Sequence, residues 1–145
     1  MLNGYLKQIN KGEKIMLLTT SLCFAAAAVL VNFWLGMRIG KLRHVHKVSV
    51  GDGGHDALLR RMRAQANFLE QTPLTVVLVV LVELAGKGGQ WLAPACAVFM
   101  IGRIAHAFGM DSDTSFKPGR PIGMLTAMLF QLVLIVVAVL AVLGR

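Results

Sequence analysis

Charged and amide side chains gather on one short segment just before an apolar stretch. Four of them are spaced i, i+3, i+7 and i+10, namely Arg60, Arg63, Asn67 and Glu70. In a helix of about 3.6 residues per turn they fall within an arc of about 80°, so they share one face. Such groups at the mouth of a membrane helix cost free energy unless each is paired, which predicts a functional site. The alternative is that the arginines lie on an anionic lipid surface, while Asn67 and Glu70 bond to neighbouring helices.

A second polar face follows later in the chain, where Arg103, His106 and Met110 are spaced i, i+3 and i+7 in an otherwise apolar segment. This spacing directs the first two side chains together into a helix bundle or its mouth. For His106, both a structural hydrogen bond and a role in catalysis are compatible with the sequence.

The elements that position these residues are membrane helices. Of the 145 residues, 56% are hydrophobic and 15% are charged, which excludes an ordinary soluble enzyme and a disordered chain. Residues 15–37 and 121–144 carry no charge, and each run can cross a hydrocarbon core of about 30 Å as a helix. Two apolar segments in the middle of the chain are too short to cross the membrane alone. Each is long enough when the charged sequence beside it continues the helix. We therefore expect an all-α membrane protein, a bundle of four transmembrane helices in a single domain, 1–145. The predicted helices are 15–39, 55–85, 90–110 and 121–143, after a basic N-terminal extension, 1–14.

The net charge of +8 is distributed unevenly over this topology. Ten of the fifteen Lys and Arg residues fall on the side that holds the loop between the first two helices and the loop between the last two. The positive-inside rule predicts that this side is cytoplasmic. Nucleic-acid binding is not expected, because the cations cluster at membrane boundaries without a recognition motif. No metal site is expected either, because no carboxylate or thiol cluster accompanies His44, His46 and His55.

The segment from Arg63 to Pro73 reads R-A-Q-A-N-F-L-E-Q-T-P. It resembles the signature R-A-x-x-N-x-x-E-x-x-P of the membrane-associated proteins in eicosanoid and glutathione metabolism, the MAPEG family. The chain length, the four spans and the basic segment after the first span also resemble that family. The run 51–54, Gly-Asp-Gly-Gly, and the pair Gly102-Arg103 with His106 resemble its bacterial members. The resemblance implies a homotrimer in a bacterial inner membrane, with glutathione held between adjacent subunits near the cytoplasmic face.

Carried over by position, the resemblance implies a set of glutathione-binding residues, which are Arg43, Arg63, Gln65, Asn67, Glu70, Arg103 and His106. Arginines suit the two carboxylates of glutathione, and Glu70 suits its ammonium group. The family also places an arginine near the start of the fourth helix that stabilises the thiolate. Here that catalytic role falls to Arg120 in preference to Lys117, although both cations also fit a simple membrane boundary.

The expected function is that of an integral membrane glutathione transferase or peroxidase, with glutathione as co-substrate. Its second substrate would be a hydrophobic electrophile or a lipid hydroperoxide drawn from the bilayer. Tyrosines of the eicosanoid-synthesising members match the positions of His106 and Met110, and the only tyrosine here is Tyr5. Leukotriene- or prostaglandin-type chemistry is therefore not expected. The alternative function is a non-catalytic four-helix membrane protein whose polar face serves oligomer assembly.

Overall fold

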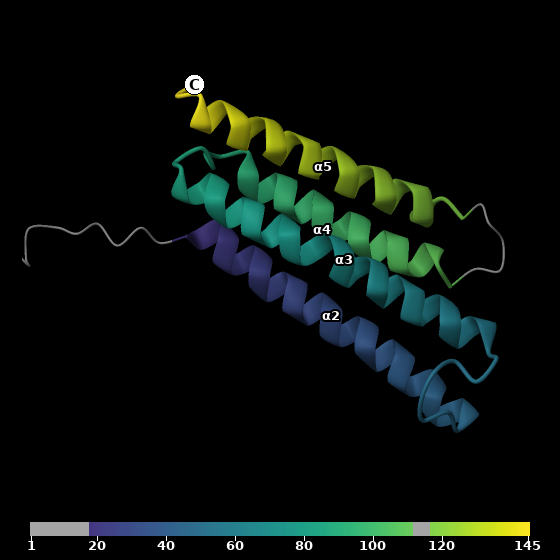
Figure 1. Cartoon of the computed structure of the whole chain (residues 1–145). Coiled ribbons are helices and arrows are strands. Elements are labelled where there is room, and N and C mark those ends of the chain that lie inside the picture. Colours follow the sequence, from purple (N-terminus) through teal and green to yellow (C-terminus); the bar gives the residue numbers. More distant parts are fainter. Residues whose placement is uncertain (1–17, 112–116) are drawn as a thin grey trace, which may run out of the picture.

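A computed structural model describes residues 18–111 and 117–145, which fold into four long helices (Figure 1). Their bounds are α2, Thr19–His46; α3, Asp56–Leu84; α4, Leu92–Gly109; and α5, Gly119–Val142. Each helix is long and apolar enough to cross a membrane, which confirms the predicted all-α class with four spans. The basic extension 1–14, Tyr5 and the predicted helix start at residue 15 lie outside the described residues.

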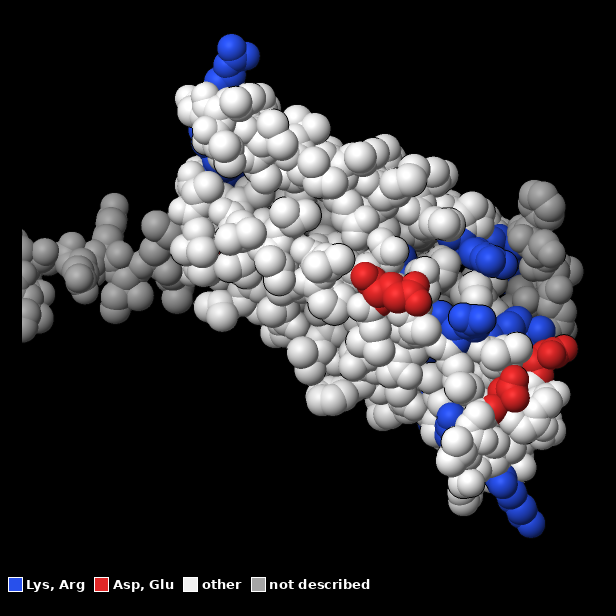
Figure 2. All heavy atoms as spheres, viewed as in Figure 1, with Lys and Arg blue, Asp and Glu red and all other residues white. Residues whose placement is uncertain are grey.

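Successive helices run in opposite directions, so the bundle has two distinct ends (Figure 1). The end of α2, the start of α3, the end of α4 and the start of α5 meet at one of them. Figure 2 shows most of the visible charged side chains at this end, while the rest of the visible face carries few charges. We call it the polar end. It corresponds to the side for which the cation count predicts a cytoplasmic position.

Helix α2 is longer than the sequence predicted. Its expected end was residue 39, but it continues to His46. Gly40 does not interrupt it, and the basic residues of the last turn suit the negative end of the helix dipole. The helix ends where Lys47 takes a left-handed conformation, at φ 55°, and the Val48 N–H donates to the Arg43 carbonyl oxygen at 3.0 Å. A local hydrogen-bond pattern sets this boundary, rather than the first cluster of cations.

Helices α4 and α5 approach each other closely because glycines face the contact. A Cβ atom built on Gly123 would lie 2.3 Å from the carbonyl oxygen of Gly102 and 2.5 Å from Cβ of His106. A Cβ atom on Gly109 would lie 2.3 Å from the backbone nitrogen of Arg120. Small residues of this kind let membrane helices pack backbone to backbone. The close contact brings the start of α5 against His106.

The rest of the bundle is held by aromatic packing and by a few buried polar contacts. The ring of Phe24 lies edge-on to Phe99, with centroids 5.6 Å apart. Gln131 donates to Gln71 Oε1 at 3.1 Å, joining α5 to α3, as expected for an amide within an apolar span.

Glu83 has a role that the sequence did not predict. Lys87 follows four residues later in the sequence, a spacing that suits an ion pair on a helix. Instead its carboxylate accepts hydrogen bonds from the backbone N–H groups of Thr20 and Ser21 and from the Ser21 hydroxyl, at 3.0, 2.8 and 2.6 Å. Glu83 of α3 thereby caps the start of α2.

Candidate functional site

A cavity of about 290 Å³ opens among α3, α4 and α5, where it brings together most of the predicted site residues. The residues that line it are Arg63, Asn67, Glu70, His106, Met110, Arg120 and Met124. Five of the eight predicted site residues are in this set. Its composition combines cations, a carboxylate, an amide and an imidazole with two flexible apolar side chains.

Helix α3 contributes one wall of the cavity. Arg63, Asn67 and Glu70 face it because residues spaced i, i+4 and i+7 lie on one side of a helix. Arg63 and Glu70 are exposed, and neither forms an ion pair with another described residue. These two opposite charges therefore remain available at the rim of the cavity.

Arg103 lies directly behind this wall. It is 2% exposed, and its Nη2 donates to Oδ1 of Asn67. Its Nε is buried and has no hydrogen-bond partner among the described residues. Arg103 thus holds Asn67 in place from behind. It also keeps one unsatisfied donor, which is costly in an apolar surrounding.

His106 joins α4 to the start of α5. Its imidazole is 4% exposed, and Nδ1 lies 3.1 Å from the carbonyl oxygen of Arg120. Because a carbonyl oxygen only accepts hydrogen bonds, Nδ1 must be the donor. The missing side chain of Gly123 leaves the space that Cα and Cβ of His106 and the Gly102 carbonyl oxygen occupy. The imidazole is therefore fixed both by a hydrogen bond and by packing.

Arg120 is exposed at the first turn of α5, and it lines the same cavity. Lys117, the other cation considered for thiolate stabilisation, is exposed and is not among the lining residues. The geometry thus favours Arg120 as the cation that a ligand in this cavity would meet.

Two predicted site residues lie elsewhere in the structure. Gln65 donates to Oδ1 of Asn32 on α2 at 3.1 Å. Since residues two apart on a helix differ by about 200°, Gln65 lies on the opposite side of α3 from Asn67. Arg43 donates to the carbonyl oxygen of Ser49 at 2.7 Å, in the segment that follows α2. Neither side chain lines the cavity.

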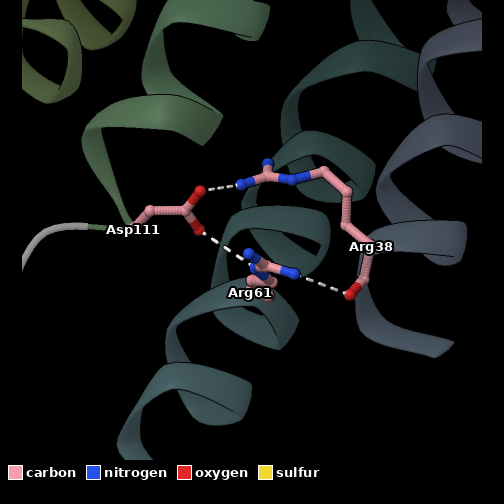
Figure 3. A network of polar contacts seen from close by, with 3 residues as sticks. All are labelled: Arg38, Arg61 and Asp111. Atoms are coloured by element: carbon pink, nitrogen blue, oxygen red, sulfur yellow. Dashed lines mark hydrogen bonds and ion pairs between the residues drawn. The ribbon is translucent and has the colours of Figure 1, made fainter. Parts of the chain in front are cut away.

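An ion network at the polar end was missed by the sequence reasoning. Asp111, just after α4, accepts from Nη2 of Arg38 and, at 3.2 Å, from Nε of Arg61 (Figure 3). Arg61 Nη1 also donates to the carbonyl oxygen of Arg38 at 3.0 Å. The Arg38 guanidinium lies over Trp34, 4.6 Å from the ring centroid. The network ties α2, α3 and the end of α4 together, and its arginines had been counted only as boundary cations.

Comparison with known proteins assigns this arrangement to a family. The pattern of the MAPEG family matches residues 21–140, which include nearly all of the four helices. The chain belongs to the MAPEG family. It is also similar to the inner membrane protein YecN of Escherichia coli strain K12, with 28% identity over 90 residues. The match covers 61% of this chain and 68% of YecN, and YecN of strain CFT073 matches equally well. This MAPEG protein is therefore a multi-pass integral protein of the inner membrane.

Proposed function

We propose that this MAPEG protein is a glutathione-dependent membrane enzyme. It would join glutathione through its thiol sulfur to hydrophobic electrophiles, or use that thiol to reduce lipid hydroperoxides. The observation that carries the proposal is the single cavity in which Arg63, Glu70 and Arg120 meet. A site for a simple anion would need the arginines but not the carboxylate.

The chemistry of glutathione fits this set of groups. The tripeptide carries two carboxylates and one ammonium group at neutral pH. Arg63 suits a carboxylate through paired hydrogen bonds, and Glu70 supplies the opposite charge for the ammonium group. The unsatisfied Arg103 Nε adds a buried donor behind Asn67. The volume of about 290 Å³ is just below the usual range for ligand pockets, about 300–1,000 Å³.

The position of Gln65 supports a site shared between subunits. Gln65 and the cavity residues lie on opposite sides of α3, so one glutathione cannot contact both within a single subunit. In a homotrimer, the α2–α3 surface of one subunit would face the open cavity of the next. Gln65 and Arg43 would then act on glutathione bound mainly by a neighbouring subunit.

The reaction requires glutathione as a thiolate. A free thiol has a pKa of about 8.5, and a nearby cation lowers it by stabilising the anion. Arg120 is the exposed cation on the α5 side of the cavity, and we assign it this role. Met110 and Met124 supply apolar, deformable lining, which suits electrophiles that enter from the bilayer.

Glutathione affinity in nanodiscs tests the proposal. Arg63→Ala and Glu70→Ala each remove a charged partner, so we expect each to weaken binding by about 10- to 100-fold. Lys117→Ala is the matched control, because it removes an exposed cation that does not line the cavity. Unchanged affinity in both site variants would refute the site assignment.

The alternative is a non-catalytic protein whose polar face builds the oligomer. Arg63 and Glu70 favour it, because both are exposed and without an ion pair to any residue that the structure describes, and a second subunit would supply partners. This alternative predicts that Glu70→Ala dissociates the oligomer even without ligand. The mass of the detergent-solubilised Glu70→Ala variant decides between the two hypotheses. The enzyme proposal expects an intact oligomer with weakened glutathione binding.

A further inference from the structure

We propose that His106 is the general base that takes the thiol proton of glutathione. The inference rests on the proposed function and adds to it a catalytic group besides Arg120. The sequence left His106 between a structural and a catalytic role. The structure provides both at once, because one ring nitrogen makes the structural bond and the other is left for a ligand.

The tautomer of His106 follows from its partner. Nδ1 lies 3.1 Å from the carbonyl oxygen of Arg120, so Nδ1 carries the hydrogen. In the neutral ring Nε2 then bears a lone pair and accepts protons. The imidazole of His106 forms no other hydrogen bond within the described part of the chain, and His106 lines the cavity. A basic nitrogen that has no hydrogen-bond partner in residues 18–111 and 117–145 is thus placed at the proposed glutathione site.

The ring is also held still, as a general base needs to be. It is 4% exposed, and its Cβ atom lies 2.5 Å from the position that a Cβ on Gly123 would occupy. Helix α5 therefore packs directly against the backbone and Cβ of His106, and the bond from Nδ1 to the Arg120 carbonyl holds the ring. A fixed base loses little entropy when it reaches the transition state, which is the advantage of a preorganised site.

The charges around the ring suit the product of the transfer. Arg103 comes from α4, Arg120 from α5, and Arg63 and Glu70 from α3. The thiolate that remains would lie among guanidinium groups, whose positive charge stabilises it. The imidazolium formed beside it is balanced by the thiolate itself and by Glu70.

The proposed step conserves atoms and charge. The S–H bond of glutathione breaks, its electron pair stays on sulfur, and an N–H bond forms at Nε2. The thiolate then attacks carbon of an aryl halide such as chlorodinitrobenzene. A C–S bond forms, the C–Cl bond breaks, and chloride leaves with its electron pair. The imidazolium finally returns its proton to water.

The test counts protons and thiolate together on glutathione binding. The ultraviolet thiolate band measures the thiolate formed, and a pH indicator in weakly buffered nanodiscs measures the protons released. Binding of S-methylglutathione, which has no thiol proton, provides the blank. In the wild type we expect fewer protons to be released than thiolates are formed, because His106 retains part of the protons.

His106→Asn is the decisive variant. Its amide nitrogen occupies the position of Nδ1 and keeps the bond to the Arg120 carbonyl, but the basic nitrogen is gone. We expect glutathione affinity to stay within about threefold, and chlorodinitrobenzene turnover at neutral pH to fall by about 100-fold or more. The difference in turnover between this variant and the wild type should shrink as the pH rises, because the thiol then ionises without a base. His55→Asn, at the same end but outside the cavity, should match the wild type.

The outcomes separate the two proposals. If the wild type and His106→Asn both bind glutathione, and their turnover and proton release are alike, His106 is not the base and the glutathione site stands. If the wild type binds no glutathione, the proposed function and the role of His106 both fail. A His106→Asn variant that loses affinity as well as turnover also overturns the base assignment, in favour of a binding role.

Discussion

Substituting Gly123 by alanine tests how strictly the α4–α5 contact controls the site. The added Cβ atom would lie 2.3 Å from the Gly102 carbonyl oxygen, whereas ordinary contact begins at about 3.4 Å. The neighbouring atoms belong to the backbone of α4 and to the Cα and Cβ of His106, so no flexible side chain can move aside. The two helices must separate by about 1 Å.

This separation has two consequences of predictable size. Overpacking of a close contact costs about 1–3 kcal/mol, and contacts with backbone atoms place this case near the upper value. The hydrogen bond between His106 Nδ1 and the Arg120 carbonyl, now 3.1 Å, would lengthen to about 4 Å and be lost. Gly123→Ala should therefore reduce both the stability of the bundle and the thiolate signal.

Denaturant unfolding in detergent micelles measures the first effect, and the thiolate band of bound glutathione measures the second. Gly40→Ala is the matched control, because a Cβ atom there has no neighbour within 4 Å. Alanine is the better helix former by about 1 kcal/mol, so this variant should be as stable as the wild type or more stable. A Gly123→Ala variant with wild-type stability would show that the helices do not pack as closely as described.

Three further variants address the polar contacts. Glu83→Ala removes the cap of α2 and should lower the free energy of unfolding by about 1–2 kcal/mol, measured by the same denaturant titration; no change would mean that water replaces the carboxylate. Asn67→Ala leaves the buried Arg103 without its acceptor and should cost about 3 kcal/mol, whereas Asn67→Asp should restore stability. Asp111→Ala should cost about 1–3 kcal/mol in the same titration, because Arg61 and Asp111 are partly exposed whereas Arg38 is buried and would lose its anionic partner, and an unchanged free energy of unfolding would contradict this reasoning.

The sequence predicted the helices better than it predicted their contacts. Charge-free runs mark membrane spans directly, since a lipid core tolerates few unpaired charges. The end of α2 was placed too early because cations after Gly40 also fit a membrane boundary. Its actual end depends on the left-handed conformation of Lys47, for which the residue type gives no signal.

Helical spacing correctly placed the α3 residues of the cavity on one face of that helix, because the angle between two residues on one helix is fixed. It could not decide whether Gln65 shares a ligand with Asn67, since that depends on which helices lie on each side of α3. Gln65 bonds to Asn32 of α2, while Asn67 accepts from Arg103 of α4. Contacts between distant segments of this kind do not follow from periodicity alone.

The glycines of the last two helices explain why the cavity has a rigid side and an open side. Gly102 and Gly109 are seven apart on α4, and Gly119 and Gly123 are four apart on α5, so each pair shares one face. Their contact fixes His106 against the α5 backbone, whereas Arg63 and Glu70 on α3 remain exposed. The imidazole of His106, which would accept the thiol proton, is thus held in position by a hydrogen bond. The side chains of Arg63 and Glu70, which would bind the charged ends of glutathione, are free to adjust. Substitutions on α3 should therefore change affinity more than turnover, and substitutions at the α4–α5 contact should change turnover more than affinity.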